Sequence, residues 1–172
     1  NVALPLVEHT KLPRNILRDA ALRTLELVGL DRFADYYPGE LSGGMRKRAG
    51  LARAIVTEPP VLFCDEPTSG LDPITAAQMD QLLLDMKACY PQMTIVVVTH
   101  DLGSVDHIAE HVLVLKSGQA AFSGTREELH AAEDPYLRRF LDRKYEESRR
   151  MAGFFLERGG SYICLFQIEV VK

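Results

Sequence analysis

Two adjacent carboxylates, Asp65 and Glu66, stand at the end of the short apolar run that begins at Val61. Such a run predicts a β-strand, and open α/β sheets bind their ligands beyond the carboxyl ends of the strands. Side chains alternate along a strand, so the two acids diverge and can take separate roles. We expect Asp65 to hold Mg²⁺, directly or through water, and Glu66 to orient or deprotonate an attacking water.

A second candidate site lies at Ser42, Gly43 and Gly44, where a serine and two glycines open a run with helical periodicity. Glycine has no Cβ, so backbone N–H groups and the positive end of the helix dipole can approach an anion. A phosphate is the ligand that we expect there. Four cations follow on this helix and are interpreted singly as a solvated face, or together as a phosphate or partner contact: Arg46, Lys47, Arg48 and Arg53.

His100 is the third candidate, and it follows the continuous apolar run Thr94 to Thr99. That run predicts a strand buried on both faces. A histidine alone is most often structural, but its position after a buried strand and beside Asp101 indicates a phosphate contact. Four other histidines have no such setting and are interpreted as structural: His9, His107, His111 and His130.

The elements that present the serine loop are predicted to be helical. Periodic apolar residues predict a helix from Pro13 to Val28, with Gly29 as its stop. Asp31 can cap a short second helix that Pro38-Gly39 ends. We therefore expect a small helical subdomain in front of Ser42.

The elements around the carboxylates predict a parallel sheet. Asp72 and Pro73 are typical of an N-cap and a first helical residue, and the helix after them leads to the strand before His100. Strand, helix and strand in this order imply parallel pairing with right-handed crossovers. Asp101 can cap a helix through Ile108, and residues 112–122 predict a hairpin.

The C-terminal part of the sequence, from Thr125 onward, is less informative. Thr125 and Glu128 have capping-box spacing and predict one helix, and Asp134-Pro135 opens another that extends to about Arg150. The tail from residue 151 ends in a strand-like run at 161–168. It is either an additional strand or a foreign end joined by a frame or assembly error, and the second interpretation is favoured.

Composition sets the remaining bounds. A chain of 172 residues with 47% apolar and 26% charged residues is typical of one globular domain. A formal charge of −4 gives no general attraction to nucleic acid or anionic membranes. Three scattered cysteines, no run of about 18 apolar residues and no leader pattern predict a soluble cytoplasmic chain. The first residue is not Met, and we expect the chain to be a fragment.

Taken together, these segments resemble the nucleotide-binding subunit of ABC transporters. The correspondence is as follows: Leu41, Ser42, Gly43, Gly44 and Met45 with the signature loop, Val61 to Asp65 with Walker B, Glu66 with the catalytic glutamate, Ser69, Gly70, Leu71 and Asp72 with the D-loop, and His100 with the switch histidine that contacts the γ-phosphate. The resemblance implies an α/β fold: a partial P-loop NTPase (RecA-like) ABC ATPase core with a parallel sheet, plus the ABC helical subdomain.

The implied boundaries are 1–57 for the helical subdomain with the signature loop, 58–132 for the C-terminal half of the RecA-like core, and 133–172 for a helical extension and unassigned tail. The implied cofactors are ATP and Mg²⁺. The family works as a head-to-tail dimer, with Asp72 reaching across it, so the implied partner is a second ATPase subunit. The pattern Gly-x-x-x-x-Gly-Lys-[Ser/Thr] does not occur in these residues. We therefore expect the chain alone to be inactive and to bind ATP weakly or not at all.

Less specific similarities indicate one group within the family. The front end from Asn1 to Pro13, Met45 in place of the common Gln, Asp72 to Thr75, and Asp134 to Asp142 resemble the Mla-type ATPases that drive phospholipid transport. This implies membrane permease subunits, a lipid-binding partner of the mammalian-cell-entry type, no nucleic acid, and a peripheral place on the cytoplasmic face of the inner membrane. Two alternatives stay open: an ABC ATPase without a transport role, and a non-catalytic regulatory or interaction domain.

Overall fold

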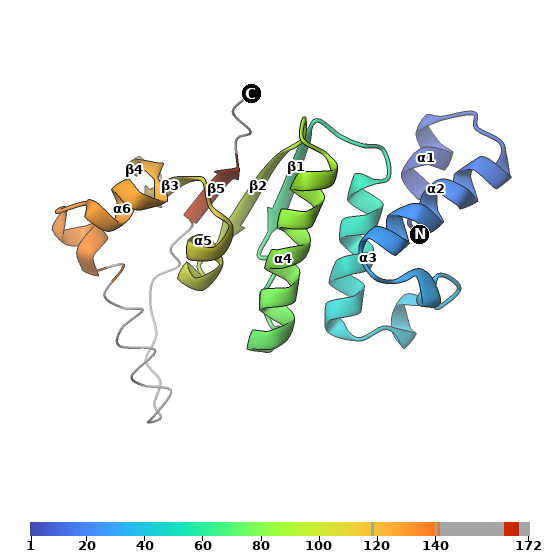
Figure 1. The fold of residues 1–172 in the computed structure, drawn as a ribbon, viewed down its shortest axis with the longest axis horizontal. Helices are drawn as coiled ribbons and strands as arrows, with labels where there is room; N and C mark the ends of the chain where they lie inside the picture. Colours follow the sequence, from blue (N-terminus) through green and yellow to red (C-terminus); the bar gives the residue numbers. More distant parts are fainter. Residues whose placement is uncertain (118, 140, 142–163, 169–172) are drawn as a thin grey trace. The chain divides into compact units, whose positions relative to one another are not determined.

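The structure is a computed structural model that describes residues 1–117, 119–139, 141 and 164–168 (Figure 1). Its described residues form two compact units. The first unit contains residues 1–62 and 67–95, and the second contains residues 63–66 and the described residues from 96 onward. The chain therefore enters the second unit twice, once briefly at 63–66 and again after residue 95.

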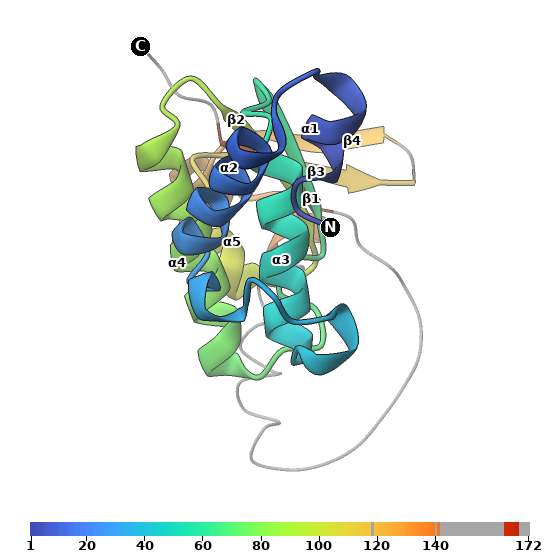
Figure 2. The same ribbon diagram turned by 90° about the vertical axis from the view of Figure 1, so that its right-hand side faces the viewer.

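Helices make up most of the first unit. They are α1 (Leu4–His9), α2 (Arg14–Leu27), α3 (Gly43–Ile55) and α4 (Pro73–Cys89), with single 3-10 turns η1 (Asp31–Phe33) and η2 (Pro38–Glu40) between α2 and α3. Helices α2 and α3 pack against each other, as both ribbon views show (Figures 1 and 2). Their core includes Val28, Leu30, Ala52 and Ile55, all at most 2% exposed.

The predicted boundaries of the first long helix are confirmed. Helix α2 begins after Pro13, and Gly29 follows it with a φ of +70°, a conformation in which glycine avoids the Cβ penalty. The short helix predicted between Asp31 and Pro38-Gly39 is wrong. Asp31 lies in the first turn of η1 and caps nothing, and Pro38 begins η2. So short a segment cannot offset the cost of helix nucleation, and only single turns form.

The strands form one five-stranded sheet in the order β1-β2-β5-β3-β4. Their bounds are β1 (Val61–Asp65), β2 (Thr94–Thr99), β3 (His111–Lys116), β4 (Gln119–Thr125) and β5 (Cys164–Ile168). Strands β1 and β2 run parallel, because the N–H of Thr94 donates to the Pro60 carbonyl at 2.9 Å and the N–H of Glu66 donates to the Val98 carbonyl at 2.8 Å. The predicted parallel arrangement of these two strands is confirmed.

Strand β3 pairs with its two neighbours in antiparallel fashion. The predicted hairpin is confirmed as β3 and β4, and β3 also pairs with β5, with His111 opposite Gln167 and Val114 opposite Cys164. The strand predicted at 161–168 is therefore present over Cys164–Ile168, while residues 151–163 lie outside the described part. Of the helix predicted from Tyr136 to about Arg150, residues 136–139 and 141 are helical, and the remaining residues lie outside the described part.

Two short helices of the second unit begin as predicted. Asp101 caps α5 (Leu102–Ile108), accepting from the N–H of Gly103 at 2.7 Å. Thr125 and Glu128 form the capping box of α6 (Arg126–Ala131). Within the described residues, no helix combines the length and the apolar character that crossing a membrane requires.

Candidate functional site

Glu66 and His100 contact each other directly, although they are 34 residues apart in the sequence. Glu66 follows β1 and His100 follows β2, so the parallel pairing of these strands places both at the same end of the sheet. The distance between His100 Nδ1 and Glu66 Oε1 is 2.6 Å. Two of the three predicted hydrolytic residues are thus joined in the second unit.

The backbone of Glu66 has an unusual conformation. Its φ is +46°, in the left-handed region that non-glycine residues rarely occupy, while its N–H is held by the Val98 carbonyl. Such a conformation costs free energy and persists only where surrounding contacts impose it, which happens most often at functional sites. No sequence pattern indicated this strain. It turns the carboxylate of Glu66 away from the regular alternation of β1 and toward His100.

The Glu66–His100 pair serves orientation more than stability. The His100 side chain is 68% exposed and that of Glu66 is 33% exposed, and ion pairs in such positions contribute little to folding. When Nδ1 carries the proton, the imidazole donates to the carboxylate, and the hydrogen bond fixes both side chains. The pair therefore holds a carboxylate ready at the end of β1, where it can act on a bound water.

Asp65 is exposed beside this pair. Burial alternates along β1, with Leu62 and Cys64 buried and Asp65 on the exposed face. Among the described residues, no three His, Cys, Asp or Glu side chains gather as a metal cage. The donor set fits Mg²⁺, because Mg²⁺ keeps several waters and is usually bound by one or two carboxylates together with substrate phosphates.

Thr99 supports the histidine and was missed in the sequence. It is 1% exposed, and its hydroxyl accepts from the N–H of Asp101 at 3.0 Å. Asp101 in turn caps α5. The residues on both sides of His100 are thereby anchored. A threonine that ends an otherwise apolar strand was the available signal.

The serine loop lies at the surface of the first unit. Ser42 is exposed and caps α3, and its Oγ accepts from the N–H of Met45 at 3.2 Å. The N–H groups of Gly43 and Gly44 belong to the first helical turn, so they have no intrahelical acceptor. A Cβ at Gly43 would meet nothing within 4 Å. The open space at Gly43 fits an anion that approaches the start of α3.

Arg46 anchors this loop, which the interpretation as a solvated face did not anticipate. Its Nη1 donates to the carbonyl of Leu41 at 2.6 Å, directly before Ser42. Arg48 donates from Nη2 to Oε1 of Gln78 in α4 at 3.0 Å. At least two of the four cations on α3 therefore make hydrogen bonds within the first unit, in addition to any contact with a bound anion.

The segment Ser69 to Asp72 leads into α4. Gly70 has a φ of +72°, and Asp72 caps the helix by accepting from the N–H groups of Ile74 and Thr75, both at 3.1 Å. The hydroxyl of Thr75 also donates to Asp72 Oδ2 at 2.6 Å. These hydrogen bonds, that from the Thr75 side chain first, lower the pKa of Asp72 below its usual value. The predicted N-cap role of Asp72 is confirmed.

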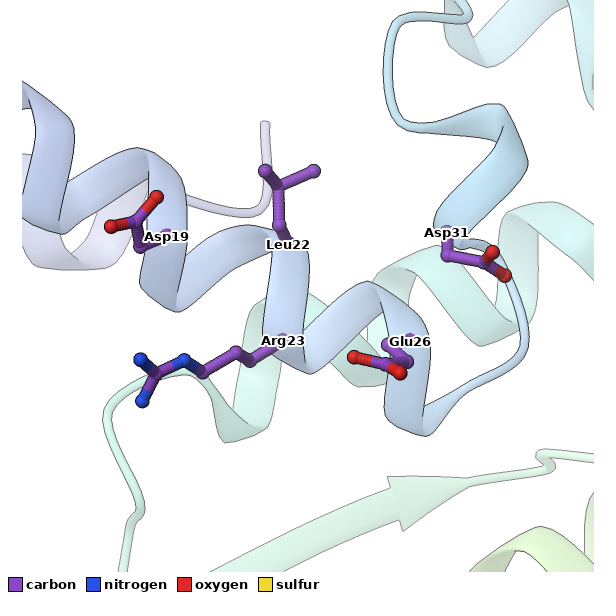
Figure 3. A pocket seen from close by; sticks show the side chains of 5 residues that line it. All are labelled: Asp19, Leu22, Arg23, Glu26 and Asp31. Atoms are coloured by element: carbon purple, nitrogen blue, oxygen red, sulfur yellow. The ribbon is translucent and has the colours of Figure 1, made fainter.

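An open hollow of about 350 Å³ lies elsewhere on the first unit, between α2 and η1. Figure 3 shows its lining residues: Asp19, Leu22, Arg23, Glu26 and Asp31. None of the predicted site residues lines it. With three acids and one arginine, the hollow carries net negative charge.

Comparisons with known proteins identify the family of this chain. A sequence model of the family described as "ABC transporter" matches residues 7–69. The solved structure of CbiO1 from Clostridium perfringens, part of the ABC transporter complex CbiONQ, is similar over 88% of this chain and 59% of its own length, with a TM-score of 0.70 and 31% identity. The chain belongs to the ATP-binding proteins of ABC transporters, and the family recognised in the sequence is confirmed.

Two relatives with named transport systems are also similar to this chain. The "Probable ribonucleotide transport ATP-binding protein mkl" of Mycobacterium leprae is 43% identical over 142 residues, which are 83% of this chain and 41% of the relative. The "Intermembrane phospholipid transport system ATP-binding protein MlaF" of Escherichia coli is 44% identical over 142 residues, which are 83% of this chain and 52% of the relative. The chain thus spans about half the length of the curated relatives that it matches.

Proposed function

We propose that this chain contributes hydrolytic and nucleotide-contacting residues to an ABC transporter ATPase that drives phospholipid transport. The observation that carries the proposal is the contact between Glu66 and His100, 2.6 Å long, with Glu66 in a strained conformation at the end of β1. A strained, oriented carboxylate at the carboxyl end of a parallel strand is suited to hydrolysis. Family membership supports ATP as the nucleotide.

In this proposal Glu66 orients the attacking water and takes its proton, while His100 keeps the carboxylate in place and contacts the terminal phosphate. Asp65 would hold Mg²⁺ on the neighbouring face of the strand. When bound, Mg²⁺ and ATP supply the reacting phosphate and neutralise its charge. One acid would thus serve the metal while the other serves the attacking water.

The serine loop would serve a second nucleotide. Ser42, Gly43 and Gly44, with Leu41 and Met45 on either side, would place the start of α3 against the phosphates of ATP bound by another ATPase subunit, most simply a second copy. The exposed position of Ser42 and the open space at Gly43 support this role. The D-loop, Ser69 to Asp72, would lie at the same subunit interface, with Gly70 and Leu71 between its ends.

The transported substrate is proposed from the relatives. MlaF is named for phospholipid transport and mkl for ribonucleotide transport, at nearly equal identity. We prefer phospholipid, because the front end and residues 134–142 resemble the Mla-type ATPases. The corresponding partners are membrane permease subunits and a lipid-binding protein of the mammalian-cell-entry type, and the ATPase would be peripheral on the cytoplasmic face of the inner membrane.

The negatively charged hollow on the first unit suits a permease contact. Cytoplasmic loops of membrane proteins carry an excess of Lys and Arg, and the carboxylates of Asp19, Glu26 and Asp31 would attract them. In this proposal the permease would contact the helical subdomain, on a surface separate from the serine loop.

A chimera tests the proposal. The matching 142-residue region of Escherichia coli MlaF is replaced by the corresponding residues of this chain, and the protein is assembled with the other components of that transport system. We expect ATP hydrolysis and phospholipid transport. Glu66→Gln should lower turnover at least roughly 100-fold while ATP still closes the dimer, because the amide cannot accept the proton of water.

Glu58→Gln is the matched control. Glu58 also has a positive φ, 49°, and is exposed, but it lies before β1 rather than after it. This variant should hydrolyse ATP as fast as the unmodified chimera. Turnover by the Glu66→Gln chimera equal to that of the Glu58→Gln chimera would refute the catalytic role of Glu66.

A further inference from the structure

The two glycines of the serine loop have different surroundings. A Cβ at Gly43 would stand in open space, whereas a Cβ at Gly44 would lie 2.9 Å from Cγ2 of Thr75 and 3.8 Å from Cδ2 of Leu71. The first of these distances is shorter than real Cβ contacts, so any side chain at position 44 would displace Thr75. Gly44 is therefore required by packing within the chain, in addition to any ligand at the start of α3.

Thr75 is itself held by the D-loop. Its hydroxyl donates to Asp72 Oδ2 at 2.6 Å, and its N–H donates to Asp72 Oδ1 at 3.1 Å. These two bonds fix the Thr75 rotamer, because the χ1 angle of a β-branched residue sets hydroxyl and methyl together. With the hydroxyl turned to Asp72, the methyl group is directed at Gly44.

A second contact keeps the two helices in this register. One turn further along α3, Arg48 donates from Nη2 to Oε1 of Gln78, which lies one turn further along α4 from Thr75. The first two turns of α3 and α4 are thus linked twice, by a methyl group against a glycine and by a hydrogen bond. All of these residues belong to the first compact unit.

We propose that Thr75 is a positioning residue, which transmits the position of the D-loop to the serine loop of the same chain. Asp72 fixes Thr75, and the Thr75 methyl fixes Gly44, so the N–H groups at the start of α3 cannot move toward α4 unless the D-loop moves as well. This inference rests on the proposed function for its catalytic consequence. The contact itself can be tested without it.

The test is a double-mutant cycle on Gly44 and Thr75. Gly44→Ala introduces the clashing Cβ, and Thr75→Ser removes the methyl group that it would meet but keeps the hydroxyl for Asp72. In the 172-residue chain, Gly44→Ala should lower the melting temperature by roughly 5 °C and speed amide exchange at Met45. Adding Thr75→Ser should restore most of the melting temperature and of the slow amide exchange, because removing the methyl group makes room for the new Cβ.

In the MlaF chimera, the same cycle tests the positioning role. Gly44→Ala should lower ATP turnover at least roughly tenfold, because a small displacement of a site residue is costly. Thr75→Ser alone should raise the ATP concentration for half-maximal turnover about threefold, since the loop is no longer held against α4. The double variant should recover to within about threefold of the unmodified chimera.

Gly43→Ala is the matched control for folding, because its Cβ has nothing within 4 Å. Its melting temperature should equal or slightly exceed that of the unmodified chain, since alanine is the better helix former. The inference is overturned if Gly44→Ala melts like Gly43→Ala, or if Thr75→Ser fails to restore it. Restored stability without restored turnover would overturn the positioning role. An active Glu66→Gln chimera would refute the proposed function alone and leave the stability cycle valid.

Discussion

Glu66 owes its place in the candidate site to its backbone as much as to its carboxylate. A φ of +46° ends the alternation of β1 one residue after Asp65, and the bond to the Val98 carbonyl holds it there. Glu58, which lies before β1, has a similar φ, but its N–H donates to the nearby Ile55 carbonyl at 2.8 Å rather than to a neighbouring strand. Chemical type alone therefore does not single out the acid that we propose to be catalytic. Its surroundings do.

Cys64 differs from these acids because it is buried. It is 8% exposed, two residues before Glu66, and burial raises the pKa of its thiol from 9.0 to about 11. Below pH 9 the thiol is protonated in both the folded and the unfolded chain, so the pKa difference has no effect. Above pH 9 the unfolded chain loses the proton first, and stability must fall as the pH rises toward 11.

We predict a loss of about 2 kcal/mol in the free energy of unfolding between pH 9 and 11 from this group. Urea unfolding at a series of pH values measures it. Cys64→Ala should flatten the alkaline decline, although it lowers stability at pH 7 by leaving a small cavity. Cys89→Ala, which changes an exposed thiol, should keep the decline. If the stability of the two variants declined equally between pH 9 and 11, Cys64 would not be the group responsible for the decline.

At the scale of elements, helix ends carry most of the local information. Four side chains each cap a helix by accepting a hydrogen bond from a backbone N–H: Ser42, Asp72, Asp101 and Thr125. Three of these caps stand directly beside a candidate site segment. The reason is geometric, because a cap marks the place where a loop becomes a helix, and the exposed N–H groups of that turn are the ones that bind ligands.

The end of α2 gives the element-scale prediction. Gly29 has a φ of +70°, so Gly29→Ala should cost about 1 kcal/mol, the penalty of a Cβ in the left-handed region. Gly39→Ala is the matched control, since Gly39 has no positive φ and a Cβ there meets nothing within 4 Å. Thermal unfolding of both variants measures the difference. Equal melting temperatures would show that Gly29 is not required to end α2.

At the scale of the whole molecule, the position of β5 was not predictable. The chain forms β2, α5 and β3 in succession, yet β5 from the far end of the sequence lies between β2 and β3. Strand character at 161–168 could be predicted from its residues. Its neighbours could not, because pairing between distant strands depends on which edge is available once the rest of the sheet has formed.

A truncation tests the contribution of β5. Ending the chain at residue 141 removes the partners of His111 to Val114 on one side of β3. We expect this to cost about 3 kcal/mol, from the loss of a few backbone hydrogen bonds, and to speed amide exchange in β3. A chain that ends at residue 168 keeps β5 and is the control. If both truncated chains unfold at the same urea concentration, β5 is dispensable.

The amino-acid sequence by itself determined the local features of this protein. The apolar runs became β1 and β2, the helix that starts at Ser42 and the one that starts at Asp72 begin where their caps predict, and the order of motifs identified the ABC transporter ATPases. Each of these depends on residues within a few positions of one another, so the chemistry of neighbours is sufficient.

Only the tertiary structure decided which distant residues meet. It joined Glu66 to His100, set the Thr75 methyl group against Gly44, and inserted β5 between β2 and β3. It also replaced the short helix predicted at Asp31 by single turns. Such contacts arise from packing and backbone pairing between segments far apart in the sequence, and no local pattern encodes those distances.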